Sequence, residues 1–180
     1  LFRQPDLART LARVKAHGAG DFYQGETARL IAADMNANGG LITLEDLKNY
    51  VAKERTPLKG SYRGHEIITM PPPSSGGIVM LEVLNMLEGY DLRAMGANSA
   101  AKFHLFTEAS RRAFADRAEY MADPDFADVP VGRLTDKKYA EMRRSTINTE
   151  KADASAATKF GDVAIKEGTE TTHFTVIDKD

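Results

Sequence analysis

The sequence contains no cysteine among its 180 residues, which excludes disulfide bridges and metal sites built from thiolates. No apolar run approaches the ~20 residues that a helix needs to cross a bilayer, so we expect no membrane span. The formal net charge is only −2, which gives no electrostatic reason to expect binding to nucleic acid or to an anionic membrane. With 42% hydrophobic and 28% charged residues, the composition is typical of a globular chain.

The two ends of the chain also lack features of a complete protein. The first residues, LFRQPDLART, contain neither an initiator Met nor the apolar core of a signal peptide. Near the other end, residues 171–177 (TTHFTVI) are mostly β-branched or aromatic, which is typical of a strand. Asp178 then resembles the start of a turn, with no partner strand after it. We therefore expect an excised fragment.

Helices are predicted for the N-terminal part of the chain. Apolar residues recur at helical spacing in DLARTLARVKAHGAG, which Gly18 can end, and again in GETARLIAADMNANGG. Thr43 stands three residues before Asp46, a capping signal for a short third helix.

The pattern then changes to short β-forming runs separated by Pro and Gly. Residues 53–62 and 65–70 are predicted to form a hairpin around Arg63 and Gly64. The three prolines at 71–73 cannot continue a strand ladder and are expected to be extended.

Two strong helices and a linker follow. Ser74 or Ser75 can cap the apolar helix GGIVMLEVLNMLEGY. Asn98 or Ser99 can cap the strongest helix of the chain, and Thr135 is a candidate cap for a shorter helix, LTDKKYAEMRRSTI. Residues 148–170 have little hydrophobic character and are predicted to be a mobile linker. The apolar side of the strongest helix is predicted to consist of Phe103, Phe106, Ala109, Ala113, Phe114 and Ala118.

Two segments have polar side chains that could support chemistry. PPPSSGG could bind an anion at a helix start, but it lacks the Lys and the spacing of a phosphate loop, so a rigid turn is the competing interpretation. ADRAEYMADPDF could contain a general acid and base, or it could be a solvated helix end with ion pairs to Arg112 and Arg117. Its carboxylates are Asp116, Glu119, Asp123 and Asp125.

The histidines do not predict a metal site. None of them occurs at a spacing typical of metal ligands. His104 lies between apolar neighbours and is expected to be a packed, hydrogen-bonded residue at the core or its boundary.

Thr171 is a candidate nucleophile. A threonine hydroxyl needs a base, and cleavage of the chain just before Thr171 would supply one as the new α-amino group. The pKa of that group, roughly 7.7–8.0, leaves a useful fraction neutral near pH 7. The β-branch would also restrict χ1 and hold the hydroxyl near the amine. The alternative interpretation is a plain strand that is rich in threonine.

Several segments together resemble the γ-glutamyltranspeptidase family of N-terminal-nucleophile hydrolases. TTHFTVIDKD resembles the family's processing-site motif, and PPPSSGG resembles its Pro-Ser-Gly-Gly segment. GDFYQGETARLIA, GGLITLEDLKNY and ADRAEYMADPDF resemble further family segments in the family's order. The resemblance covers nearly the whole chain.

The resemblance implies a self-cleaving precursor. The bond between Glu170 and Thr171 would be the processing site, and Thr171 would then attack the γ-glutamyl amide of glutathione or a related compound. The resulting ester would be resolved by water or by an amino acid or peptide acceptor, without a metal or organic cofactor. The substrate-binding arginine and the oxyanion-hole glycines of the family would lie outside this chain, so the chain alone is expected to be inactive.

The implied fold class is α+β, a mainly helical piece of an αββα sandwich with a few short strands. Residues 1–147 would belong to the large subunit, 148–170 would be the linker before the processing site, and 171–180 would be the first strand of the small subunit. The missing remainder of both subunits would be the protein partner, and the unpaired strand at 171–177 could add to another molecule's sheet edge. Family habit implies a periplasmic or secreted protein.

Two other functions fit the same residues. Related self-processing acylases act on β-lactam side chains or on poly-γ-glutamate. A helical, non-catalytic homologue would use the Thr-Thr-His sequence only as a strand.

Overall fold

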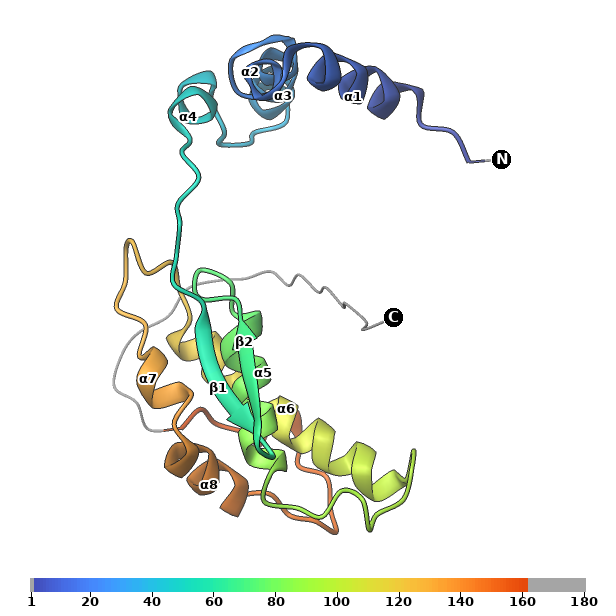
Figure 1. The fold of residues 1–180 in the computed structure, drawn as a ribbon, viewed down its shortest axis with the longest axis vertical. Coiled ribbons are helices and arrows are strands. Elements are labelled where there is room, and N and C mark those ends of the chain that lie inside the picture. The colour runs from blue at the N-terminus through green and yellow to red at the C-terminus, as the bar shows by residue number, and fades with distance from the viewer. Residues whose placement is uncertain (1, 162–180) are drawn as a thin grey trace. The chain divides into compact units, whose positions relative to one another are not determined.

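The computed structural model describes residues 2–161 and divides after Glu54 into two compact units (Figure 1). The secondary-structure elements described in the first unit are all helices. The second begins at Arg55 and contains a two-stranded sheet and the remaining helices. Within residues 2–161, no helix is both long and apolar enough to cross a membrane.

The first unit contains one helix more than the sequence predicted. The unpredicted helix, α2, has only six residues and lies between Gly18 and Gly25, so it is too short to show a periodic pattern. Gly18 has a φ of 65° and ends the first helix, as predicted. The capping box is also confirmed, because Thr43 accepts from the N–H of Asp46 and Asp46 accepts from the N–H of Thr43. The four helices are α1 (Pro5–His17), α2 (Ala19–Gln24), α3 (Glu26–Ala37) and α4 (Leu44–Asn49).

The second unit begins with the predicted hairpin, formed by β1 (Leu58–Tyr62) and β2 (His65–Thr69). The strands are antiparallel, with Leu58 opposite Thr69 and Tyr62 opposite His65. Arg63 and Gly64 have φ values of 49° and 85°, the paired positive angles that a type I′ turn requires. The first strand starts at Leu58 instead of residue 53, because Pro57 has no N–H to donate to a ladder.

The connection from the hairpin to the next helix differs from the prediction. Pro72 and Pro73 form a turn with a cis bond between them, instead of an extended segment. Helix α5 (Gly76–Leu87) follows with Ser75 at its N-cap position. The Ser75 hydroxyl does not cap the helix but accepts a hydrogen bond from Arg117 Nε at 2.8 Å.

The remaining helices are α6 (Ala100–Tyr120), α7 (Val131–Leu134) and α8 (Lys137–Ser145), followed by a 3₁₀ turn, η1 (Ser155–Ala157). Ser99 caps α6 as predicted, by accepting from the N–H of Lys102 at 3.2 Å. The prediction of Thr135 as a cap is wrong. Its hydroxyl donates to the Val131 carbonyl, and Asp136 caps α8 instead.

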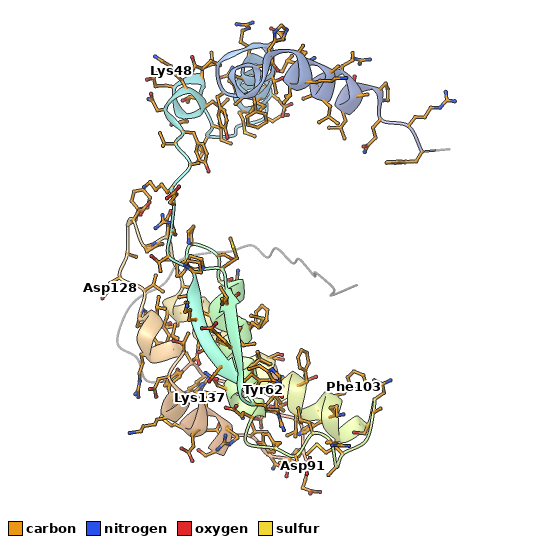
Figure 2. The ribbon with its side chains drawn as sticks, viewed as in Figure 1. Lys48, Tyr62, Asp91, Phe103, Asp128 and Lys137 are labelled. Atoms are coloured by element: carbon orange, nitrogen blue, oxygen red, sulfur yellow. The ribbon has the colours of Figure 1, made fainter. Side chains whose placement is uncertain are left out.

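Helix α5 is the centre of the second unit. It is apolar around most of its circumference and contacts β1, α6, α7 and α8 (Figure 1). The Lys137 ammonium at the start of α8 also donates to the Ser61 carbonyl at 2.7 Å, which attaches α8 to the hairpin (Figure 2). One buried apolar cluster consists of Val83, Met86, Leu87, Leu105, Ala109, Ala113, Ala140 and Ile147. A second consists of Ile78, Tyr120, Met121, Val129, Leu134 and Tyr139.

The buried face of α6 is not the predicted one. Phe103, Phe106 and Phe114 are 61%, 54% and 47% exposed, and only the predicted Ala109 and Ala113 are buried. Figure 2 shows Phe103 on the first part of α6. Charged residues occupy the buried face beside the two alanines. The buried residues of α6 are Leu105, Glu108, Ala109, Arg112, Ala113, Asp116 and Tyr120.

The start of α5 depends on a glycine. A Cβ on Gly77 would lie far inside contact distance of the Met70 carbonyl oxygen, and 2.9 Å from Thr69 Cγ2. The backbone oxygen of Met70 cannot rotate away, so this close approach of α5 to the preceding chain requires glycine at position 77.

Replacing Gly77 by Ala should destabilise the full-length protein by about 1–3 kcal/mol, because the added methyl group overpacks the junction of β2 and α5. The midpoint of urea denaturation measures the effect. Gly132→Ala in α7 is the matched control, since its Cβ would meet nothing within 4 Å. Equal midpoints for the two variants would contradict the predicted clash.

Candidate functional site

The predicted processing site, Glu170 and Thr171, lies outside the described residues, and so does the predicted strand at 171–177. The structure does describe the segment that leads toward them, up to residue 161. The interpretation of 148–170 as a mobile linker stays a prediction. The assignment of 1–147 to the large subunit and of 171–180 to the small subunit also stays a prediction. The described part of that segment, 148–161, is attached to α6 and α8 at several points, and these attachments are the candidate site.

The first attachment is made at Asp153. The Asp153 carboxylate pairs with Arg112 Nη2 at 2.8 Å, and its backbone N–H donates to Glu108 Oε1 at 3.2 Å. Arg112 is buried and also donates to Glu108 Oε2 at 2.8 Å and to the Thr146 carbonyl at 2.6 Å. The hydrogen bond from Arg112 lowers the pKa of Asp153, so the pairing favours the ionised carboxylate.

The second attachment surrounds Gly161, whose two backbone polar groups are both hydrogen-bonded. Its N–H donates to Asp116 Oδ1 at 2.6 Å, and its carbonyl accepts from the Tyr120 hydroxyl. A Cβ at this position would overlap the Tyr139 hydroxyl and lie 2.8 Å from Tyr139 Cζ and 3.0 Å from Arg143 Cδ. Only glycine fits here without displacing its neighbours. We call Gly161 with these four side chains the Gly161 clamp.

Asp116 is the centre of the clamp and has no exposed surface. Its Oδ2 accepts from the Tyr139 hydroxyl at 3.0 Å and lies 2.9 Å from Arg143 Nε. Arg143 Nη2 in turn donates to the carbonyls of Lys159 and Arg112, each at 3.0 Å. Burial raises the pKa of Asp116, although the bonds from Gly161, Arg143 and Tyr139 oppose that shift.

Glu82 of α5 lies beside this network and has no partner in the described hydrogen bonds for either carboxylate oxygen. It is 2% exposed. Burial, and then the neighbouring Asp116 charge, raise the pKa of Glu82 well above its ordinary value, while Arg143 opposes the shift. Two carboxylates can hydrogen-bond only if one carries a proton. Burial favours the neutral, protonated form of Glu82.

Within the acidic segment ADRAEYMADPDF, Asp116 differs from the predicted solvated helix end, whereas Asp123 and Asp125 do form ion pairs. Asp116 is buried instead of solvated, and its partner is Arg143 instead of Arg112 or Arg117. Asp123 and Asp125 are ion-paired with Arg55, at 3.8 Å and 2.9 Å, and Glu119 is half-buried.

His104 lies outside the hydrogen bonds around Asp116. His104 is half-buried, and its Nε2 lies 2.7 Å from the Asn148 carbonyl oxygen, which confirms a hydrogen-bonded residue at the core boundary. Among residues 2–161, no three His, Cys, Asp or Glu side chains are arranged to hold a metal ion.

Comparison with known proteins places the whole chain in one family. The family model described as Gamma-glutamyltranspeptidase matches residues 1–180. The chain is 46% identical over 177 residues to the glutathione hydrolase proenzyme of Escherichia coli (strain K12), covering 98% of this chain and 30% of that protein. The chain belongs to the γ-glutamyltranspeptidase family.

Other family members have related sequences and structures. The γ-glutamyltranspeptidase of Helicobacter pylori superposes with a TM-score of 0.78 and 47% identity, over 94% of this chain and 49% of that one. The acylase ACY 1 proenzyme of Pseudomonas sp. (strain V22) is 47% identical, over 97% of this chain and 31% of that protein. The chain thus spans about a third of the length of the glutathione hydrolase and acylase proenzymes. The predicted fold class, a mainly helical α+β chain with a few short strands that resembles part of a γ-glutamyltranspeptidase, is confirmed.

Sequence reasoning missed Glu82, Tyr139, Arg143 and Gly161 in this member of the γ-glutamyltranspeptidase family. Glu82 had a usable signal, because it is an acidic residue within the apolar helix GGIVMLEVLNMLEGY. Arg143 had no such signal. The helix around it, KKYAEMRRS, is rich in charges of both signs, so one more arginine does not stand out.

Replacing Glu82 by Gln should stabilise the protein increasingly as the pH rises from 5 to 8. Glu82 has a raised pKa in the fold, so its stabilising contribution is complete below the unfolded pKa of about 4.3 and is lost as pH rises through the folded pKa. Gln keeps a donor for Asp116 and needs no proton.

Thermal unfolding of the full-length protein at several pH values measures this difference. Glu141→Gln makes the same change on the exposed side of α8 and is the control. A difference between Glu82→Gln and the parent protein that stays constant from pH 5 to 8 would show that Glu82 is already ionised in the fold.

Proposed function

We propose that the full-length protein is a γ-glutamyltranspeptidase that cleaves its own precursor between Glu170 and Thr171 and then uses Thr171 as its nucleophile. The observation that carries the proposal is the 46% identity to a glutathione hydrolase proenzyme across 98% of this chain. The matched family region also includes Thr171 and the Thr-Thr-His sequence that resembles the family's processing motif.

The proposed cleavage is an acyl shift followed by hydrolysis. The Thr171 hydroxyl oxygen attacks the Glu170 carbonyl carbon, the peptide C–N bond breaks, and the hydroxyl proton passes to the leaving nitrogen. The resulting ester is hydrolysed by water. Glu170 becomes a C-terminal carboxylate, and Thr171 gains a free α-amino group that can act as its base.

The proposed turnover repeats the same chemistry on an external amide. The α-amino group takes the hydroxyl proton while Thr171 attacks the γ-carbonyl of glutathione or a related compound, and the departing amine receives a proton. The γ-glutamyl ester on Thr171 is then attacked by water, or by the amino group of an amino acid or peptide. The bonds that form and break need no metal or organic cofactor.

The missing remainder of the two subunits is the protein partner in this proposal, because the chain spans about a third of its curated relatives. Residues that hold the substrate's α-carboxylate and the oxyanion are proposed to lie in that remainder. A periplasmic or secreted location is proposed from family habit.

Replacing Thr171 by Ala in the full-length precursor should abolish cleavage, because Ala has no hydroxyl to attack Glu170. Intact mass spectrometry should show two chains for the parent protein, the shorter beginning at Thr171, and one chain for the variant. Thr172→Ala is the neighbouring control and should still be cleaved. An uncut parent precursor after prolonged incubation would instead support a non-catalytic homologue.

The 180-residue chain by itself should not hydrolyse a γ-glutamyl anilide, since the substrate-holding residues are proposed to lie elsewhere in the protein. Absorbance of released p-nitroaniline is the measurement, with the matured full-length enzyme as the positive control. Measurable turnover by the isolated chain would refute this expectation.

An acylase is the second candidate function, because the acylase ACY 1 proenzyme is as similar to the chain as the glutathione hydrolase is. Both share the proposed nucleophile and differ in the acyl group they accept. The ratio of kcat/KM for glutathione to kcat/KM for an acylated cephalosporin, measured on the matured enzyme, separates the two.

A further inference from the structure

The Gly161 clamp lies ten residues before the proposed cleavage site at Thr171. All of its members are within the described part of the chain and belong to a single compact unit. Asp116 and Tyr120 come from α6, whereas Tyr139 and Arg143 come from α8. Two helices therefore hold one backbone position from different sides.

The contacts fix the position of Gly161 more closely than packing alone would. Its N–H donates to a carboxylate at 2.6 Å, a charge-assisted hydrogen bond of the stronger class. Its carbonyl accepts from the Tyr120 hydroxyl, and the Tyr120 ring packs edge-on against Phe160 with centroids 5.7 Å apart. The missing Cβ leaves space for Tyr139. Any displacement of Gly161 breaks at least one of these contacts.

Both members of the buried Asp116–Arg143 pair also bind the segment itself. Asp116 accepts from the Gly161 N–H, and Arg143 donates to the Lys159 carbonyl at 3.0 Å. If the segment leaves, Asp116 loses the hydrogen bond from the Gly161 N–H, and Arg143 loses its hydrogen bond to the Lys159 carbonyl. The charges thus favour one position of the segment, which a plain apolar contact would not do.

A fixed Gly161 restricts the chain that follows it. Ten residues reach at most about 33–36 Å when fully extended, so Thr171 is confined to that distance from the clamp. The proposed acyl shift is intramolecular and needs the hydroxyl and the preceding carbonyl in one orientation. Fixing the upstream end removes conformations that cannot react, and misplacement by about 1 Å can cost about 100-fold in rate.

We propose that the Gly161 clamp positions the segment before Thr171 for self-cleavage, so that Asp116, Tyr120, Tyr139 and Arg143 are positioning residues for maturation and not for γ-glutamyl transfer. This inference rests on the proposed cleavage between Glu170 and Thr171. The competing explanation is that the clamp only stabilises the second unit, and the test must separate the two.

Gly161→Ala is the central variant, and Gly77→Ala is its matched control. Both add one methyl group to a glycine of the same unit that has no room for it, but Gly77 contacts β2 and lies outside the clamp. Stability is measured for each in the Thr171→Ala background, where no cleavage interferes. Cleavage is measured as the first-order rate of conversion of the full-length precursor at equal temperature.

The expected result is that Gly161→Ala slows precursor cleavage by about 10- to 100-fold. Gly77→Ala should change the rate by less than about twofold at a comparable loss of thermal stability. Once matured, Gly161→Ala enzyme should have the kcat/KM of the parent enzyme for a γ-glutamyl anilide. A cleavage rate that follows stability equally in both variants would overturn the proposal.

A milder variant covers the case in which Gly161→Ala does not fold. Tyr120→Phe keeps the ring against Phe160 and removes the hydroxyl that donates to Gly161, so cleavage should slow by about two- to tenfold, the equivalent of one hydrogen bond. Cleavage at the parent rate would contradict the clamp.

The double variant Gly161→Ala/Tyr139→Phe tests the contact itself. Tyr139→Phe removes the hydroxyl that the new methyl group would overlap, so Gly161→Ala should slow cleavage less in the Tyr139→Phe background than in the parent protein. Equal slowing in both backgrounds would show that Gly161→Ala does not act through the contact with the Tyr139 hydroxyl.

Failure of the proposed function has a different signature. A parent precursor that stays uncut, or a Thr171→Ala variant that is cut, would remove the cleavage on which the inference rests. Normal cleavage of the parent, none of Thr171→Ala, and equal rates for Gly161→Ala and Gly77→Ala would remove only the inference.

Discussion

The second unit depends on a buried charge pair between α6 and α8. Asp116 and Arg143 are 0% and 6% exposed, and their side chains approach to 2.9 Å. Burying an ion costs several kcal/mol. The attraction between the two charges offsets that cost only when their remaining polar atoms are also hydrogen-bonded. Here the Tyr139 hydroxyl and the Gly161 N–H bind the Asp116 oxygens, and Arg143 Nη2 donates to two backbone carbonyls. Removal of either charge would leave the other unpaired, at a cost of about 3–5 kcal/mol.

This requirement explains the unusual buried face of α6. Glu108, Arg112 and Asp116 follow one another at intervals of four residues, so they share one face of the helix. That face contacts the segment 148–161 through Asp153 and Gly161 and contacts α8 through Arg143. The alanines between the charges, Ala109 and Ala113, pack into the apolar core. One helix thus supplies both a hydrophobic contact and a polar attachment surface.

Local signals in the sequence were sufficient for most elements of the fold. The capping box of Thr43, the Ser99 cap and the hairpin turn at Arg63 and Gly64 each depend on a few neighbouring residues, and each was predicted. The orientation of α6 was not, because periodicity identifies an apolar side but cannot show that a charged side is buried. The buried face was decided by partners on α8 and on the segment 148–161, far away in the sequence.

The candidate site was hidden from sequence reasoning for a related reason. Residues 148–170 were predicted to be a mobile linker because the segment has little hydrophobic character. Most of the anchoring, however, uses the backbone: the N–H of Asp153, the carbonyl of Lys159, and both polar groups of Gly161. Backbone groups are present in every sequence, so hydrophobicity and composition carry no trace of them. Some contacts of the segment do depend on side-chain identity: they involve the Asp153 carboxylate, the Ser155 hydroxyl, the Phe160 ring, and the glycine whose absent Cβ makes room for Tyr139. A segment can therefore have linker composition and still be held in one place, provided that the residues around it carry the information.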